Sequence, residues 1–138
     1  MTLAITGSYA AALTALYLLL SLRVIAVRRS QRINLGDGND PDMLRRMRAH
    51  GNFAEYVPLG LLLLLIAEQQ GTAALWLHLT GLLLLAGRLA HGLNFTYALK
   101  SMLLRTGGMA LTFASLIIGA ILALSLIHIS EPTRQAEI

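Results

Sequence analysis

Four long apolar stretches constrain the fold of this chain more than any other feature of its sequence. They lie at about residues 3–27, 53–67, 72–95 and 107–123, and the first is uncharged until Arg23. An α-helix needs about 20 apolar residues to cross the hydrocarbon core of a bilayer. The second helix is expected to begin well before its apolar run, because Asp40 is a good capping residue and Pro41 suits the first helical position. The sequence therefore predicts an all-α fold, an integral membrane four-helix bundle.

The composition supports the same conclusion. Of the 138 residues, 56% are hydrophobic and 13% are charged, whereas a soluble domain carries about 25% charged residues. A chain of this length forms one domain and cannot bury so much apolar surface in a soluble core. The N-terminal segment lacks a basic region and a small-residue cleavage site, so it is interpreted as a retained helix. The absence of cysteine excludes disulfides, thiolate metal sites and a protein thiol nucleophile, and no metal is expected.

The last residues are interpreted separately. Residues 124–134 read L-S-L-I-H-I-S-E-P-T-R, which resembles the translation of a sequencing-library adapter, and residues 135–138 would continue it. The alternative is a genuine polar tail. We expect residues 1–123 to form the transmembrane domain and residues 124–138 to be a non-native tail derived from the adapter.

Basic residues are distributed unevenly among the connections between the predicted spans. Arginines cluster around the first connection, Lys100 and Arg105 lie on the third, and the second has none. Because Lys and Arg gather on cytoplasmic loops, both termini are predicted to be non-cytoplasmic. A basic patch at a membrane surface more often meets lipid phosphates than nucleic acid, so no nucleic-acid partner is expected.

Polar side chains recur at helical spacing on two of the predicted spans. They are Arg45, Arg48, Asn52 and Glu55 on the second helix, and Arg88 and His91 on the third, where the aromatic Phe95 continues the same spacing. Spacings of three, four and seven residues place such side chains on one face of a helix. An ionisable side chain inside a membrane costs at least ~2.5 kcal/mol and normally pairs within a bundle or a cavity. Glu55 is therefore expected to pair with Arg48 or with Arg88.

Individual members of this polar set also have simpler interpretations. Arginines at the membrane boundary can extend to phosphate headgroups, Asn52 can hydrogen-bond between helices, and His91 can be a packed polar residue. A buried ion pair adds little stability, so a combination of Glu55 with an arginine favours a binding site. Arginines, an amide and one carboxylate suit a small zwitterion with excess negative charge. Apolar walls between helices, where Pro58 should kink the second helix, would accept a lipophilic second substrate from the bilayer.

Four segments of the sequence resemble one known family. Residues 48–58, R-A-H-G-N-F-A-E-Y-V-P, resemble the signature of the MAPEG family, the membrane-associated proteins in eicosanoid and glutathione metabolism. The resemblance continues in residues 36–38, G-D-G, in residues 86–91, A-G-R-L-A-H, and in residues 105–109, R-T-G-G-M. These features are most similar to the small bacterial inner-membrane branch of the family, and the likeness covers nearly all of residues 1–123.

The resemblance implies a homotrimer that binds glutathione at its subunit interfaces. By position in the motifs, the glutathione contacts would be Arg48, Asn52, Glu55, Tyr56, Arg88 and His91 from one subunit and Arg28 from its neighbour. Arg105 would be the catalytic residue, since it lies nearest the arginine that eukaryotic members place beside the thiol. The sequence departs from the family at two points: Phe95 stands where several enzymes have a tyrosine, and the spacing from His91 to Arg105 differs slightly.

The implied activity is that of a membrane-bound glutathione transferase or peroxidase. An arginine beside the sulfur would favour the thiolate, which would attack a lipophilic electrophile or reduce a hydroperoxide. The alternatives are a glutathione binder without turnover and a non-catalytic membrane protein, either a small carrier or a structural bundle. A carrier would need Glu55 to exchange protons, and a carboxylate held by adjacent Arg48 is a poor proton carrier.

Overall fold

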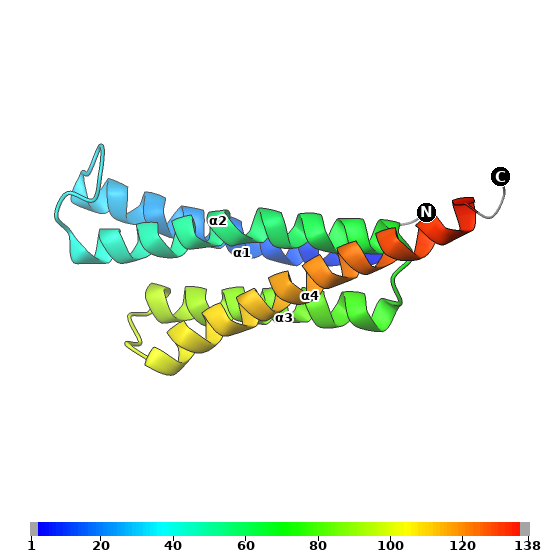
Figure 1. Ribbon diagram of the computed structural model, residues 1–138. Helices are drawn as coiled ribbons and strands as arrows, with labels where there is room; N and C mark the ends of the chain where they lie inside the picture. The colour runs from blue at the N-terminus through cyan, green and yellow to red at the C-terminus, as the bar shows by residue number, and fades with distance from the viewer. Residues whose placement is uncertain (1–2, 136–138) are drawn as a thin grey trace.

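The computed structural model describes residues 3–135, with side chains described for residues 3–95 and 97–125. Over this range the regular secondary structure is all α-helix, and short turns and loops connect the helices (Figure 1). The helices are α1 (Ala4–Gln31), α2 (Pro41–Gln69), α3 (Ala74–Thr96) and α4 (Met102–Gln135). All four are long and apolar enough to cross a membrane. The predicted all-α fold with four spans is therefore confirmed.

The start of α2 is formed as the sequence predicts. The Asp40 Oδ1 atom accepts a hydrogen bond of 2.8 Å from the Met43 N–H, and Pro41 occupies the first turn. Asp42 complements the positive end of the helix dipole and accepts hydrogen bonds from Arg45 (2.9 Å) and Arg46 (3.0 Å). These contacts fix the helix start about a dozen residues before its apolar run, as expected.

The start of α4 differs from the prediction. The sequence suggested a connection over residues 96–106 and a helix from about residue 107, whereas α4 begins at Met102. The Ser101 Oγ atom accepts from the Leu104 N–H at 3.2 Å, and the Asn94 Oδ1 atom accepts from the Ser101 N–H at 3.0 Å. These side chains cap the helix one and a half turns earlier than the glycine pair at 107–108 suggested. Arg105 therefore lies on α4 and not on a loop. The expected end of the natural domain, after Ala123, falls inside α4, and residues 136–138 of the expected tail lie outside the described part of the chain.

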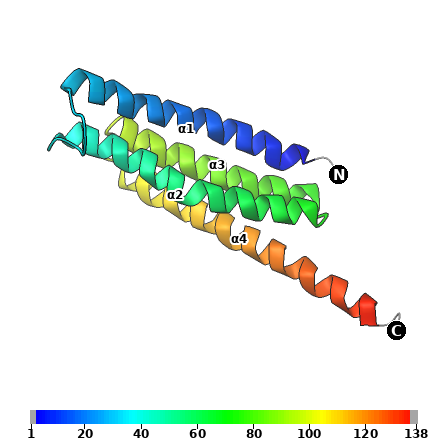
Figure 2. The ribbon, with the colours of Figure 1, turned by 90° about the horizontal axis from the view of Figure 1, so that it is seen from above.

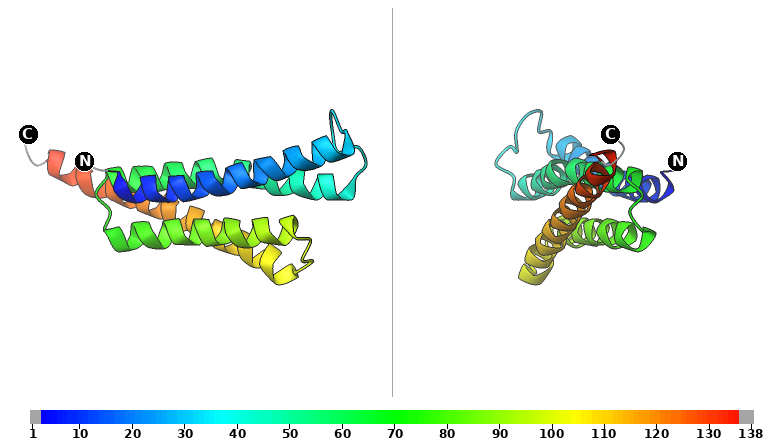
Figure 3. Two further views of the ribbon diagram at one scale, coloured as in Figure 1. Left: turned by 180° about the vertical axis from the view of Figure 1, so that it is seen from behind. Right: turned by 45° about the vertical axis from the view of Figure 1, so that its right-hand side comes forward.

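The helices form an elongated bundle in which α4 crosses the other helices obliquely. Helix α2 contacts all three other helices, whereas α1 and α4 make no contact with each other over the described residues. Figure 2 shows α4 leaving the bundle toward its C-terminal end. The α1–α2 and α3–α4 connections lie at one end, and the α2–α3 turn lies at the other (Figure 3). The basic residues of the first and third connections therefore share one end of the molecule.

Two clusters of buried apolar side chains hold the first three helices together. One joins Leu13 and Leu20 of α1 to Phe53 and Val57 of α2 and Leu84 of α3. The second lies nearer the opposite end and contains Tyr9, Leu64, Ala67 and Leu77. At that end the Glu68 carboxylate accepts from the Ile5 N–H (3.0 Å) and the Thr6 N–H (2.8 Å), so the end of α2 caps the start of α1.

Two glycines bring α3 and α4 into close contact. A Cβ atom at Gly108 would lie 2.8 Å from the Gly87 carbonyl oxygen and 2.9 Å from the His91 nitrogen. Small residues allow helix backbones to approach closely in membranes. The crossing sets the start of α4 against the part of α3 that carries Arg88 and His91.

Candidate functional site

A cavity of about 430 Å³ opens between α2, α3 and α4 at the end that carries the basic connections. This volume suits a small-molecule ligand. Its lining residues are Leu44, Met47, Arg48, Gly51, Asn52, Glu55, His91, Phe95, Arg105 and Met109. The set includes Arg48, Asn52, Glu55, His91 and Arg105 from the residues predicted by sequence. The structure therefore brings together, from three helices, most of the residues on which the predicted site depends.

Arg88 lies directly behind this cavity and is only 1% exposed. Its Nη1 donates to the Asn52 Oδ1 atom at 2.6 Å, and its Nε and Nη2 donate to the Thr112 Oγ1 atom at 3.0 and 2.6 Å. The guanidinium carbon also lies 5.4 Å from the centre of the Tyr56 ring, a cation–π distance. Neutral dipoles and an aromatic face thus surround this buried cation.

The expected ion pair between Glu55 and an arginine of the same chain is not found. The ion pairs among the described residues join Asp42 to Arg45 and Arg46. The donor groups of Arg88 are engaged by Asn52 and Thr112. Glu55 is exposed in the cavity wall. The pairing prediction was wrong for the single chain, because helical spacing places Glu55 on the correct face but does not show which neighbour Arg88 prefers.

His91, Phe95 and Arg105 form one wall of the cavity. The His91 side chain is buried, and its ring centre lies 4.7 Å from that of Phe95. The Phe95 ring also contacts Arg105, whose guanidinium carbon lies 5.7 Å from the ring centre. Arg105 is exposed in the cavity, so its charge is available to a bound anion. The residues that line the whole cavity supply two cations (Arg48 and Arg105), one carboxylate (Glu55) and one amide (Asn52).

Comparison with known proteins now settles the family. Residues 6–125 match the MAPEG family. The chain belongs to the MAPEG family. It is also 32% identical, over 114 residues, to the inner membrane protein YecN of Escherichia coli strain K12, and equally to that of E. coli O6:H1 strain CFT073. The alignment covers 83% of this chain and 86% of each relative. The resemblance inferred from the motifs is confirmed.

Besides Arg88, two further predicted site residues of this MAPEG chain do not line its own cavity. Arg28 donates to the carbonyl oxygens of Gly36 (3.1 Å) and Ile33 (3.4 Å), so it holds the α1–α2 connection. Its predicted contact with a ligand in a neighbouring subunit stays a prediction. Tyr56 packs against Phe113 at 5.7 Å between ring centres and covers Arg88. It therefore lies behind the cavity, on the same side as Arg88.

Sequence reasoning missed two α4 residues of the site, Met109 and Thr112. Met109 lines the cavity and its sulfur lies 3.3 Å from the Arg88 Nη2 atom. Thr112 is fully buried and accepts both hydrogen bonds described above for Arg88. Arg105, Met109 and Thr112 are spaced i, i+4 and i+7, which is one helical face. The same spacing argument applied to α4 would have found them.

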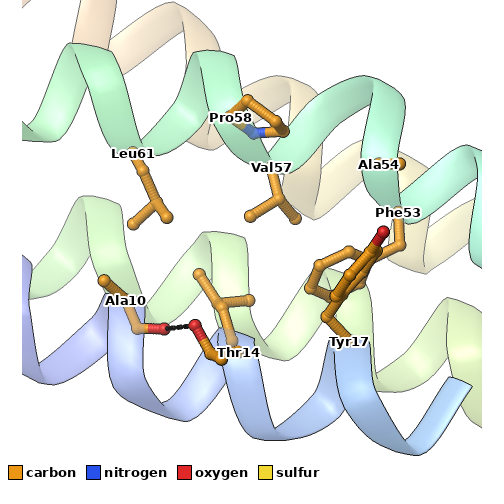
Figure 4. Close-up of a pocket in the computed structure, with 9 residues that line it drawn as sticks. Ala10, Thr14, Tyr17, Phe53, Ala54, Val57, Pro58 and Leu61 are labelled. Carbon is orange, nitrogen blue, oxygen red and sulfur yellow. Dashed lines mark hydrogen bonds between the residues drawn. The ribbon is translucent and has the colours of Figure 1, made fainter. Parts of the chain in front are cut away.

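A separate apolar groove lies between α1 and α2 (Figure 4). It has a volume of about 240 Å³ and shares no lining residue with the polar cavity. Buried Leu13, Phe53 and Val57 form its floor, and Pro58 lies at its edge. Tyr17 closes one end, with its ring centre 4.9 Å from that of His50. An apolar wall beside Pro58 was expected, but within one chain it opens on a different face of α2 from the polar cavity.

Proposed function

We propose that this MAPEG protein binds glutathione in the polar cavity and joins it through its sulfur to lipophilic electrophiles, or uses it to reduce lipophilic hydroperoxides. The convergence of Arg48, Asn52, Glu55 and Arg105 on one cavity of about 430 Å³ carries the proposal. Glutathione has two carboxylates, one ammonium group and one thiol. Arginine forks suit the carboxylates, and Glu55 suits the ammonium group. The match in charge and number of groups supports this ligand over a simple anion.

The chemical step rests on Arg105. A free thiol has a pKa of about 8.5, so only a few per cent is ionised at neutral pH. Lowering that value by ~2 units requires about 2.7 kcal/mol, which one partly desolvated arginine can supply. In a transfer, the thiolate forms the S–C bond while the leaving group departs with its electron pair, or water protonates the adduct. In a peroxide reduction, the thiolate sulfur bonds to one peroxide oxygen as the O–O bond breaks, and the departing alkoxide takes a proton to become an alcohol. The resulting sulfenic acid then reacts with a second glutathione thiol to give the disulfide and water.

The proposed setting is the bacterial inner membrane, with the protein assembled as a homotrimer. The E. coli relatives are named inner membrane proteins, and the four spans fit that location. The end that bears the basic connections and the cavity is proposed to face the cytoplasm. Glutathione would then enter from the cytoplasm, and the lipophilic substrate would arrive from the bilayer.

Glutathione titration of the detergent-purified protein tests the proposal. We expect saturable binding that Arg48→Gln weakens by about one to two orders of magnitude, the equivalent of ~1.4–2.8 kcal/mol. Arg46→Gln is the matched control on the same helix, because Arg46 does not line the cavity and its partner Asp42 keeps Arg45. Absence of saturable binding, or equal losses in both variants, would contradict a glutathione site here.

Arg105→Gln tests the chemical step separately. The thiolate of bound glutathione is detected by its ultraviolet absorbance, and we expect this signal to fall in the variant. S-methylglutathione has no ionisable thiol, so its affinity should change much less. If both ligands lose affinity equally and the thiolate signal persists, Arg105 holds a carboxylate and the activation mechanism is wrong.

A further inference from the structure

Asn52 stands between the buried Arg88 and the polar cavity, and this arrangement fixes which of its amide atoms faces the ligand. The Arg88 Nη1 atom lies 2.6 Å from the Asn52 side chain. A guanidinium has only donor groups, so the amide atom that it meets must be the oxygen. The chemistry of the two groups thereby distinguishes the two ends of the amide.

The Asn52 nitrogen is left for the cavity. Asn52 lines the cavity, and its Nδ2 group has no hydrogen-bond partner among the described side chains. A primary amide nitrogen donates and does not accept. The residue therefore presents N–H groups to whatever occupies the cavity.

Arg88, which holds Asn52, is itself held by Thr112 of α4. The Thr112 hydroxyl donates to the Gly108 carbonyl oxygen at 2.8 Å and accepts from both Nε and Nη2 of Arg88. Thr112 is fully buried, and Arg88 is 1% exposed. Arg88 therefore donates hydrogen bonds to both neighbouring helices, to Asn52 on α2 and to Thr112 on α4. An amide flip at Asn52 would set donors against donors.

We propose that Arg88 is a positioning residue. By holding the Asn52 oxygen, it orients the Asn52 N–H groups into the cavity, where they donate to an oxygen of the ligand. The acceptor is a carboxylate oxygen, and an ammonium or amide N–H group is rejected there. This inference rests on the proposed function, since it assigns one oxygen group of glutathione to Asn52. The ammonium group is left to Glu55, on the same helix and in the same cavity.

Asn52→Asp separates this role from a structural one. The variant keeps the shape of the side chain and gives Arg88 a charged acceptor, so we expect a thermal unfolding midpoint above that of the parent, and an unchanged midpoint would count against the contact with Arg88. Its second oxygen would face the cavity and repel a ligand carboxylate. Glutathione binding should weaken by about tenfold or more, since one donor is lost and a like charge is introduced. A variant that binds glutathione as the parent does would overturn the proposal.

Ligand analogues supply the matching rescue. Glutathione in which one or other carboxylate is replaced by a carboxamide carries N–H donors at that position. One of the two analogues should lose affinity for the parent and regain it in Asn52→Asp, because the new oxygen accepts from the amide. If neither analogue reverses its preference, Asn52 does not read a ligand oxygen and the proposal fails.

The stability measurement needs no ligand, so it distinguishes failure of this inference from failure of the proposed function. Any gain in the unfolding midpoint from Asn52→Asp should vanish in an Arg88→Gln background, because the gain requires the arginine charge. In an Arg88→Lys background, which retains the charge, part of the gain in the unfolding midpoint should remain. A gain that persists in Arg88→Gln would show that Arg88 does not hold position 52. A parent protein that binds no glutathione would refute the proposed function. The unfolding midpoints of the Asn52 and Arg88 variants would still show whether Arg88 holds Asn52.

Discussion

Glu55 shares a cavity wall with Arg48 and Arg105 yet forms no ion pair within the described residues of the single chain. It is exposed to the cavity, so its charge is not committed to holding the fold. A carboxylate in that position is available to a cationic group of a ligand. Its role is therefore expected to appear in ligand binding and not in stability.

Glu55→Gln tests that role, since it keeps the shape and removes the charge. We expect a nearly unchanged unfolding midpoint and glutathione binding weakened by one to two orders of magnitude, if ~1.4–2.8 kcal/mol of the interaction is lost. A desamino analogue of glutathione lacks the ammonium group, so it should bind the parent and the variant equally. Equal losses for the two ligands would place the ammonium group elsewhere.

At the scale of residues, helical spacing predicted the lining of the cavity well. Arg48, Asn52 and Glu55 share a face of α2 because the 3.6-residue period is a local property of the chain. The partner of Arg88 was not predictable in the same way. The guanidinium reaches Thr112, 24 positions along the chain, and that contact depends on how α4 crosses α3. Spacing along one helix carries no information about such a crossing.

At the scale of helices, the crossing of α3 and α4 positions the residues of the site that these two helices carry. Gly108 lies against the Gly87 carbonyl and the His91 backbone, whereas a Cβ atom at Gly107 would meet nothing within 4 Å. Gly108, which lies near the predicted start of the fourth helix, therefore serves a contact between helices. Propensity marks glycine as a helix breaker, and the close approach of two backbones overrides that preference here. The start of α2 was predictable because its capping residues are adjacent in sequence.

Gly108→Ala and Gly107→Ala form a matched pair that tests the crossing. The Cβ atom at position 108 would meet backbone atoms at 2.8 and 2.9 Å, which cannot move away as a side chain can. We expect a loss of about 1–3 kcal/mol in the free energy of unfolding, measured by denaturation in detergent. Gly107→Ala should be neutral or stabilising by up to ~1 kcal/mol, because alanine favours the helix. Similar effects of the two changes would show that α3 and α4 do not meet at these glycines.

At the scale of the whole molecule, the two basic connections lie at the same end of the bundle (Figure 3). Topology reporters fused at Asp37 and at Ser101 should therefore agree with each other, and a reporter at Gln70 should give the opposite result. The positive-inside tendency further predicts that Asp37 and Ser101 report the cytoplasm. The reverse orientation would place the cavity on the non-cytoplasmic side and would remove the cytoplasmic supply of glutathione from the proposal.

The single chain leaves charged side chains exposed around its polar cavity. Glu55 and Arg48 are exposed on α2, and Arg105 is exposed on α4. A charged side chain that faces lipid costs ~2.5–3.5 kcal/mol near the centre of a helix, and such groups normally face a bundle interior. A second copy of the chain packed against the open side of the cavity would remove this cost.

The same packing would give Arg28 a ligand to reach, since it does not line the cavity of its own chain. We therefore expect a homotrimer with a cavity at each subunit interface. Native mass spectrometry in a mild detergent should show three chains, and crosslinks should join the end of α1 to the cavity wall of a neighbour. Arg28→Gln should weaken glutathione binding while the trimer persists. A stable monomer that binds glutathione with parental affinity would show that one chain completes the site alone.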